Sequence, residues 1–291
     1  MSQWIDAAEL NAPQLALEAK LIKVGTRANL FTYLKEVWQR RAFAFTFASF
    51  QIQAATARST LGLAWVVVVP ALQILIYGLI FGFVLGSNKP DNYLPYLFIG
   101  VAFFQLLSNA ITDGSTAITG NQALVNSLDF PRGLLPLAVV ISNLIESLPV
   151  MILTLIGVAF LGQSVTASWL LLIPVLLLMV VFGAGLTLFS ARLAVFLPDF
   201  KYLLPFISRV LFYVSGIFWS ITKLTGSNHL LQLVLWNNPF HLYINLARSL
   251  TISGYETHPT DWLIASVWSV ATFFAGMIFF WLAEEKYGRN V

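Results

Sequence analysis

The stretch Arg58-Ser59-Thr60-Leu61-Gly62-Leu63-Ala64-Trp65 marks a change in the character of this chain. Before it, residues 42–57 are apolar and aromatic, but at 1.5 Å per residue they reach only roughly 24 Å, short of the ~30 Å bilayer core. After it, residues 63–86 form an apolar run that is long enough to cross, with Pro70 inside it. We therefore predict that the chain lies along a membrane surface and turns into the membrane at this corner.

The composition is that of a polytopic membrane protein. Of the 291 residues, 58% are hydrophobic and only 10% are charged, whereas soluble domains carry about 25% charged residues. A spanning helix needs ~20 largely apolar residues, and by this criterion we predict an all-α integral membrane protein with six transmembrane helices. These occupy residues 63–86, 93–113, 134–162, 169–197, 202–221 and 262–283.

Residues 29–57 are predicted to form an N-terminal amphipathic interface helix. Polar residues between Lys35 and Arg40 fall on one helical face and apolar residues between Leu30 and Trp38 on the other, which is typical of helices that lie in the interfacial plane. A surface anchor without a partner is the alternative. The remaining organisation is a cytoplasmic N-terminal tail at 1–28, a six-helix transmembrane domain at 58–283 and a cytoplasmic C-terminal tail at 284–291.

Residues 229–252 are apolar but are interrupted by Asn237-Asn238-Pro239, so neither half is long enough to span. We predict an outer re-entrant helical hairpin, which enters one leaflet and returns, with a pair of surface helices outside the lipid as the alternative. His229, His241 and His258 lie in or beside this segment without the close pairing of a helical metal site. We expect these histidines at the surface or the membrane interface.

The distribution of Lys and Arg indicates the orientation, because cytoplasmic segments are enriched in both. With the N-terminus inside, twelve of the sixteen basic residues fall on the inner side, Lys89, Lys223 and Arg248 fall on the outer side, and Arg209 lies within a span. Counting 42–57 as a span would move five inner residues to the outside. We therefore predict a multi-pass protein of the inner (cytoplasmic) membrane with both termini in the cytoplasm.

Signatures of catalysis are missing from the sequence. It contains no Gly-x-x-x-x-Gly-Lys-Ser/Thr phosphate loop and no cysteine, and no acidic pair stands where a glycosyl-transfer site would need one. We therefore expect no enzymatic activity, no metal site and no cofactor in this chain.

Two ionisable residues lie within the predicted spans. Glu146 is near mid-depth in the third span, and Arg209 is in the inner part of the fifth. Charges in lipid are costly, so both side chains should face protein or water. We predict a structural salt bridge between them, with proton coupling through Glu146 as the alternative.

Aromatic residues deep in the spans form a further group. Their ring faces could stack on the apolar faces of sugar rings along a transport path, and plain helix packing is the alternative. The residues are Tyr77, Phe81, Phe103, Phe104, Phe212, Tyr213 and Phe218, and the six other than Phe103 are the candidates for lining such a path.

The inner loop between the second and third spans carries apolar residues at near-helical spacing. We predict a short helix there, whose apolar face a soluble partner could cover. The apolar residues are Leu124, Val125, Leu128 and Phe130.

In combination, these motifs resemble type-2 ABC exporter permeases, and more narrowly those that export lipid-linked polysaccharides such as O-antigen, teichoic acid or cell-wall galactan. The resemblance covers about residues 30–283. It is carried by Arg58-Ser-x-Leu-Gly-x-x-Trp65 with Pro70, by Asn121-x-x-Leu-Val125 with Phe130-Pro131-Arg132 and Leu135-Pro136, and by Asn238-Pro239 with Arg248.

Two positions depart from the family pattern. The family often has an arginine before the aspartate where this chain has Leu197-Pro198-Asp199. It also often has Ser-Pro where this chain has Ser215-Gly216, which indicates a differently kinked helix in the fifth span.

The resemblance implies a permease subunit that forms a homodimer and associates with two copies of a cytoplasmic ABC ATPase, which would bind ATP and Mg. Residues 119–132 would form the coupling helix on the ATPase, and residues 229–252 the outer gate with Asn238, Pro239 and Arg248. The expected coupling residues are Asn121, Leu124, Val125, Phe130, Pro131 and Arg132.

The same resemblance implies a glycan channel at the dimer axis, with the six aromatic residues named above as its expected lining. A diphospholipid-linked polysaccharide would enter from the inner leaflet near Arg40, Arg41, Arg58 and Trp65, because arginine attracts phosphate. The alternative is that these arginines only contact anionic membrane lipids. Nucleic acid is not an expected partner.

Two other function classes stay open at this point. An ion-coupled secondary transporter commonly shows internal repeats and ion ligands at the midplane, and we detect no convincing repeat. An integral membrane enzyme that modifies glycans or lipids should show clustered acids at a membrane face, which this sequence lacks.

Overall fold

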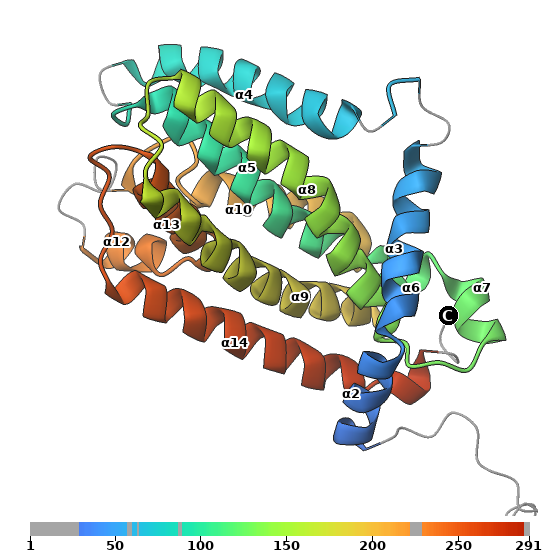
Figure 1. Ribbon diagram of the computed structural model, residues 1–291. Helices are drawn as coiled ribbons and strands as arrows, with labels where there is room; N and C mark the ends of the chain where they lie inside the picture. The colour runs from blue at the N-terminus through green and yellow to red at the C-terminus, as the bar shows by residue number, and fades with distance from the viewer. Residues whose placement is uncertain (1–28, 57–59, 63, 87–88, 222–228, 288–291) are drawn as a thin grey trace, which may run out of the picture.

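The computed structural model describes residues 29–56, 60–62, 64–86, 89–221 and 229–287 (Figure 1). Within these residues all regular secondary structure is helical and no strand occurs, as predicted. Five of the six predicted spans correspond to helices long and apolar enough to cross a membrane. They are α4 (Ala64–Val84), α5 (Tyr93–Thr112), α8 (Leu134–Phe160), α9 (Leu172–Phe196) with the preceding turn η2 (Ala167–Leu171), and α14 (Thr260–Trp281).

Helix α5 is the centre of the bundle. It packs against α4, α8 and α9, and also against the shorter helices α10 (Phe200–Val214) and α13 (Pro239–Thr251). In the most hydrophobic 18-residue stretch of α5, 72% of the residues are buried, compared with 11% in the corresponding stretch of α4. Much of α4 is therefore left for lipid or another chain to cover.

Close backbone contact joins α9 to α14. A Cβ atom on Gly276 would lie 2.5 Å from the carbonyl oxygen of Gly185, and one on Gly185 would lie 2.5 Å from the backbone of Thr272. Small residues allow this approach, which is how helices gain van der Waals contact in a membrane without a hydrophobic driving force.

The predicted interface helix at 29–57 is divided in two. α2 (Leu30–Gln39) and α3 (Arg41–Thr56) are separated at Arg40. Figure 1 shows α3 lying across one end of the bundle, whereas α4 runs along it, so the chain changes direction between them. The intervening residues 57–59 and 63, like the predicted tail 1–28 and the end of the C-terminal tail at 288–291, lie outside the described residues.

Small residues on α3 allow it to pack closely on α8. Ala44 and Ala48 are fully buried against Leu134 and Ala138. The opposite side of α3 presents Phe45 and Phe50, which are 55% and 63% exposed. Apolar side chains therefore cover both sides of this helix.

The predicted span at 202–221 is wrong in its length. α10 has 15 residues, roughly 22 Å of helix, and ends just before Gly216, whose φ is +66°. Glycine adopts this left-handed conformation without the steric cost that other residues carry, and it commonly ends a helix in this way. Residues 215–220 are not helical. The kink expected from Ser215-Gly216 is thus a complete helix stop.

A helix that ends inside a membrane bundle leaves backbone carbonyls without partners. Arg248, on α13, supplies those partners. Its guanidinium donates to the carbonyl oxygens of Gly216 at 3.1 Å and Ile217 at 3.3 Å, and twice to that of Tyr96 at 3.1 and 3.2 Å. The guanidinium carbon lies 3.3 Å from the Tyr96 ring centroid, and the Tyr96 hydroxyl also donates to the Gly216 oxygen.

The segment α12 (His229–Trp236) and α13 is a helical hairpin by backbone, but α13 is not a surface element. Arg248 has no exposed surface, although the charge count assigned it to an outer loop. His241 is 1% exposed and its Nδ1 lies 3.0 Å from the Ser215 oxygen, so the expectation of a surface position is wrong for this histidine. The break is capped by Asn238, whose side chain accepts from the Phe240 amide at 3.0 Å and donates to the Ser215 hydroxyl.

We expect Arg248→Met to lower the free energy of unfolding by about 3 kcal/mol or more, because it leaves three buried carbonyls without their charged donor. The measurement is thermal unfolding of the purified protein in detergent. Lys35→Met, at an exposed position on α2, is the matched control. Equal unfolding temperatures for the two variants would show that Arg248 does not hold this junction together.

Candidate functional site

The six aromatic residues predicted from the sequence lie in one cluster. α4, α5, α10 and the turn after α10 each contribute. The closest pair is Phe81 and Phe218, stacked with ring centroids 4.2 Å apart, and Tyr77 lies 5.0 Å from Phe218. The other members are Phe104, Phe212 and Tyr213, joined through ring contacts of 5.0 to 5.9 Å.

The cluster is mostly internal packing. Phe104 and Phe218 are 4% and 1% exposed, so these rings contact the chain itself. Tyr213 is 45% exposed and shares the outer side of α10 with Tyr202, Phe206 and Arg209, which are also exposed. The surface that a transported molecule could contact therefore lies on this side of α10 rather than at the centre of the cluster.

The predicted coupling segment at 119–132 contains α7 (Gln122–Ser127), which follows the short helix α6 (Thr116–Thr119). Val125 is only 2% exposed, and it packs in a cluster with Phe43 and Phe47 of α3 and with the ends of α8, α9 and α14. The ring centroids of Phe130 and Phe43 lie 5.7 Å apart. The chain itself therefore covers Leu124, Val125 and Phe130, so the expectation that a soluble partner covers them is wrong, whereas Leu128 is 52% exposed.

What α7 leaves open is its polar side. The exposed residues there are Gln122, Ala123, Asn126 and Ser127, followed by Leu128. Asn121 turns inward and donates to the Ala117 oxygen at 2.8 Å, and Pro131 is buried. A protein that docks on this loop would therefore contact mainly polar atoms.

The four residues predicted at the lipid entry, Arg40, Arg41, Arg58 and Trp65, do not form one cluster among the described residues. Arg40 donates to the Asp129 oxygen at 3.3 Å, and Arg41 donates to the Trp38 oxygen at 2.9 Å and lies over its ring. Arg58 lies outside the described residues. Trp65 instead lines a cavity between α4, α5 and α8.

The predicted salt bridge between Glu146 and Arg209 is wrong. Glu146 lines the same cavity as Trp65, whereas Arg209 lies on the exposed side of α10, and neither makes an ion pair within the part of the chain that the structure describes. The reason is the arrangement of the helices. α8 and α10 each pack against α5 rather than against one another.

A buried polar network that the sequence did not indicate joins three segments at the end of the bundle near α3. The Tyr33 hydroxyl donates to Glu284 at 3.0 Å, and the backbone N–H of Arg132 donates to the other Glu284 oxygen at 2.8 Å. The N–H of Gly133 in turn donates to the Tyr33 hydroxyl at 2.9 Å. The network thus ties α2 and the turn η3 (Glu284–Lys286) to the loop before α8.

Burial raises the pKa of Glu284 from 4.5 to about 7, although the hydrogen bonds from Arg132 and Tyr33 act in the opposite direction. Burial, followed by the charge of Glu284, also raises the pKa of Tyr33. The other ionisable groups near Glu284 are Arg132, whose charge lowers the pKa of Glu284, and Glu36 and Tyr287. No sequence pattern pairs Tyr33 with Glu284, because 251 positions separate them.

We expect stability to fall as the pH rises towards neutrality. Because its folded pKa lies near 7 and its unfolded pKa near 4.5, Glu284 binds more protons in the folded state between these values. Glu284 therefore contributes its full stabilisation below its pKa in the unfolded chain. This stabilisation is lost as the pH rises through its pKa in the folded protein. The full difference is on the order of 3 kcal/mol.

Glu284→Gln should remove this dependence, which the unfolding temperature between about pH 5 and about pH 8 would measure. Glu285→Gln, at the exposed neighbouring position, is the control and should keep it. A Glu284→Gln protein whose stability changes with pH as the unsubstituted protein's does would contradict the assignment.

Comparison with known proteins identifies the family to which this chain belongs. Residues 44–252 match the family model described as ABC-2 type transporter. The chain is 27% identical over 265 residues to an O-antigen export system permease protein RfbA of Myxococcus xanthus, an alignment that covers 89% of this chain and 98% of that protein. An O-antigen export system permease protein RfbA of Klebsiella pneumoniae is 25% identical over 163 residues, covering 56% of this chain and 62% of that protein.

The matched region begins in α3 and ends just after α13, so it includes the predicted coupling segment, the aromatic cluster and the contacts of Arg248. It covers well over half of the 291 residues. Permeases of this family are multi-pass membrane proteins that pair with an ABC ATPase. The chain belongs to the ABC-2 type transporter family, as a transmembrane permease subunit.

Proposed function

We propose that this chain is the membrane subunit of an ATP-driven exporter that moves a lipid-linked polysaccharide of the O-antigen, teichoic acid or cell-wall galactan type across the cytoplasmic membrane. The observation that carries the proposal is the alignment with an O-antigen export permease over 98% of that protein's length. The exposed aromatic side chains on the outer side of α10, which could stack on sugar rings, give it independent chemical support.

The uncovered sides of α4 and α10 support a homodimer. α4 carries exposed Leu79 and Phe83 along its length, and α10 carries exposed Tyr202 and Phe206. Ring contacts between Tyr77 and Phe212 join the two helices, so the uncovered sides belong to neighbouring helices. Two copies that meet there would enclose a path with aromatic walls, and Tyr213 and Arg209 would face it.

The bundle has two different ends, which suits a directional exporter. In Figure 1 the end with α3, α6 and α7 is opposite the end with α12 and α13. We assign the first to the cytoplasm with both termini, in agreement with the Lys and Arg bias. We assign the α12–α13 hairpin to the outer side as the gate, and α10 with residues 215–221 to the incomplete fifth span that leads to it.

Coupling to the ATPase would act through α7. Movement of its loop would reach α2 and η3 through the hydrogen bonds among Arg132, Glu284 and Tyr33, and would reach α3 through the contact between Phe43 and Phe130. α2 and α3 would lie in the membrane interface, where exposed Phe31, Phe45 and Phe50 contact lipid. ATP-driven closure of two ATPase subunits would then shift the interface helices and the start of α8 together.

We expect Ala123→Arg to reduce both co-purification with the cognate ABC ATPase and ATP hydrolysis by about tenfold, because it places a bulky charge on the exposed side of α7. Ala167→Arg, an identical change at an exposed position at the opposite end, should have no effect. The measurements are pull-down and ATPase assays in lipid, with and without a lipid-linked oligosaccharide.

Failure of the unsubstituted chain to bind any ABC ATPase would overturn the proposed function. An ATPase that binds Ala123→Arg as tightly as the unsubstituted chain would overturn the docking site on α7 alone.

A further inference from the structure

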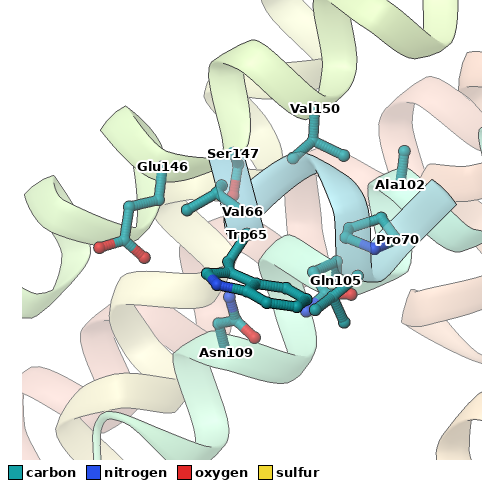
Figure 2. A pocket seen from close by; sticks show the side chains of 10 residues that line it. Trp65, Val66, Pro70, Ala102, Gln105, Asn109, Glu146, Ser147 and Val150 are labelled. Carbon is teal, nitrogen blue, oxygen red and sulfur yellow. The ribbon is translucent and has the colours of Figure 1, made fainter. Parts of the chain in front are cut away.

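We propose that the cavity between α4, α5 and α8 binds the single sugar that is attached to the lipid diphosphate of the exported glycan. This inference rests on the proposed function and adds a recognition site to it. The cavity has a volume of about 270 Å³ and lies beside the first turns of α4 (Figure 2). The residues that line it include Trp65, Gln105, Asn109, Glu146 and Ser147.

Three polar side chains in this cavity have no hydrogen-bond partner within the described chain. Gln105 and Asn109 stand one helical turn apart on α5, so they lie on the same side of it, and Glu146 comes from α8. The two amides and the carboxylate are partly exposed on the cavity wall, where a ligand can form hydrogen bonds with them. A polar ligand at this place would satisfy all three.

The choice of residues favours a sugar. A sugar ring has hydroxyl groups around its edge, which can donate to Glu146 and can both donate to and accept from the amides of Gln105 and Asn109. Trp65 supplies an apolar ring face, and it is 45% exposed. Figure 2 shows its indole ring among Gln105, Asn109 and Glu146, so stacking and hydrogen bonding can act on one ligand.

The charge of the cavity argues against a phosphate group. No Lys or Arg side chain lines it, and Glu146 would repel an anion. The lipid diphosphate must therefore lie outside the cavity, while the sugar attached to it enters. A metal ion or proton would use the carboxylate of Glu146 but would leave the amide donors of Gln105 and Asn109 unused.

The size of the cavity limits the ligand to about one ring. Sites for small ligands are typically about 300–1,000 Å³, and this cavity lies just below that range. It is therefore too small for a polymer. The sugar next to the lipid is the unit that glycans of every length share, so the site would recognise the start of the chain whatever its length.

The test compares two probes on the full permease with its ATPase in lipid nanodiscs. One probe is a polyprenyl diphosphate that carries one N-acetylhexosamine, and the other is the same polyprenyl diphosphate without the sugar. We expect the sugar-bearing probe to bind about tenfold more tightly, as one or two buried hydrogen bonds predict. Trp65→Leu and Glu146→Gln should each remove most of this advantage and leave the affinity for the bare lipid unchanged.

Trp268→Leu is the matched control, because Trp268 is also partly exposed, at 40%, but lies on α14 away from the cavity. It should keep the preference for the sugar. Equal affinities of the unsubstituted protein for the two probes would overturn the inference while leaving the proposed function intact. Binding of neither probe would overturn both. A preference for the sugar that survives both cavity substitutions would place the sugar site elsewhere.

Discussion

The guanidinium of Arg248 holds together the part of the bundle where the helical pattern fails. α10 stops at Val214, and the turn at residues 215–218 that follows it is buried, where an unpaired backbone carbonyl is costly. Arg248 reaches from α13 to the carbonyls of Gly216 and Ile217 and to Tyr96 at the beginning of α5. One side chain therefore connects the central helix, the broken helix and the hairpin, and the path of the chain to α14 depends on it.

The opposite end of the bundle uses a second buried polar group in a different way. Glu284 accepts hydrogen bonds from Tyr33 and from the backbone of Arg132, so the two ends of the chain meet the loop that follows α7. Burial raises the pKa of Glu284 to about 7. The junction beside the proposed ATPase site can therefore gain or lose a proton in the physiological range.

Much of the fold and part of the candidate site could be predicted. The lengths of the apolar runs predicted five of the membrane helices, and six of the seven aromatic residues chosen for their depth in the spans are joined in one cluster. The predictions failed where a partner had to be named. Most of the apolar face of α7 is covered by Phe43, Phe47 and their neighbours, and Glu146 lines a cavity with Trp65 rather than pairing with Arg209. Those partners lie on other helices, and neither hydropathy nor helical spacing contains information about which helices become neighbours.

The sequence by itself determined that the chain is helical, membrane-embedded and without a nucleotide loop, because apolar length, charge bias and short motifs are local properties. Only the tertiary structure decided where the fifth span stops, that Arg248 is buried, and which side of α7 remains open. These features depend on contacts across 251 positions between Tyr33 and Glu284 and across 152 between Tyr96 and Arg248. A buried polar group is tolerated only where a hydrogen-bond partner lies next to it, and the packing of the helices decides which groups become neighbours.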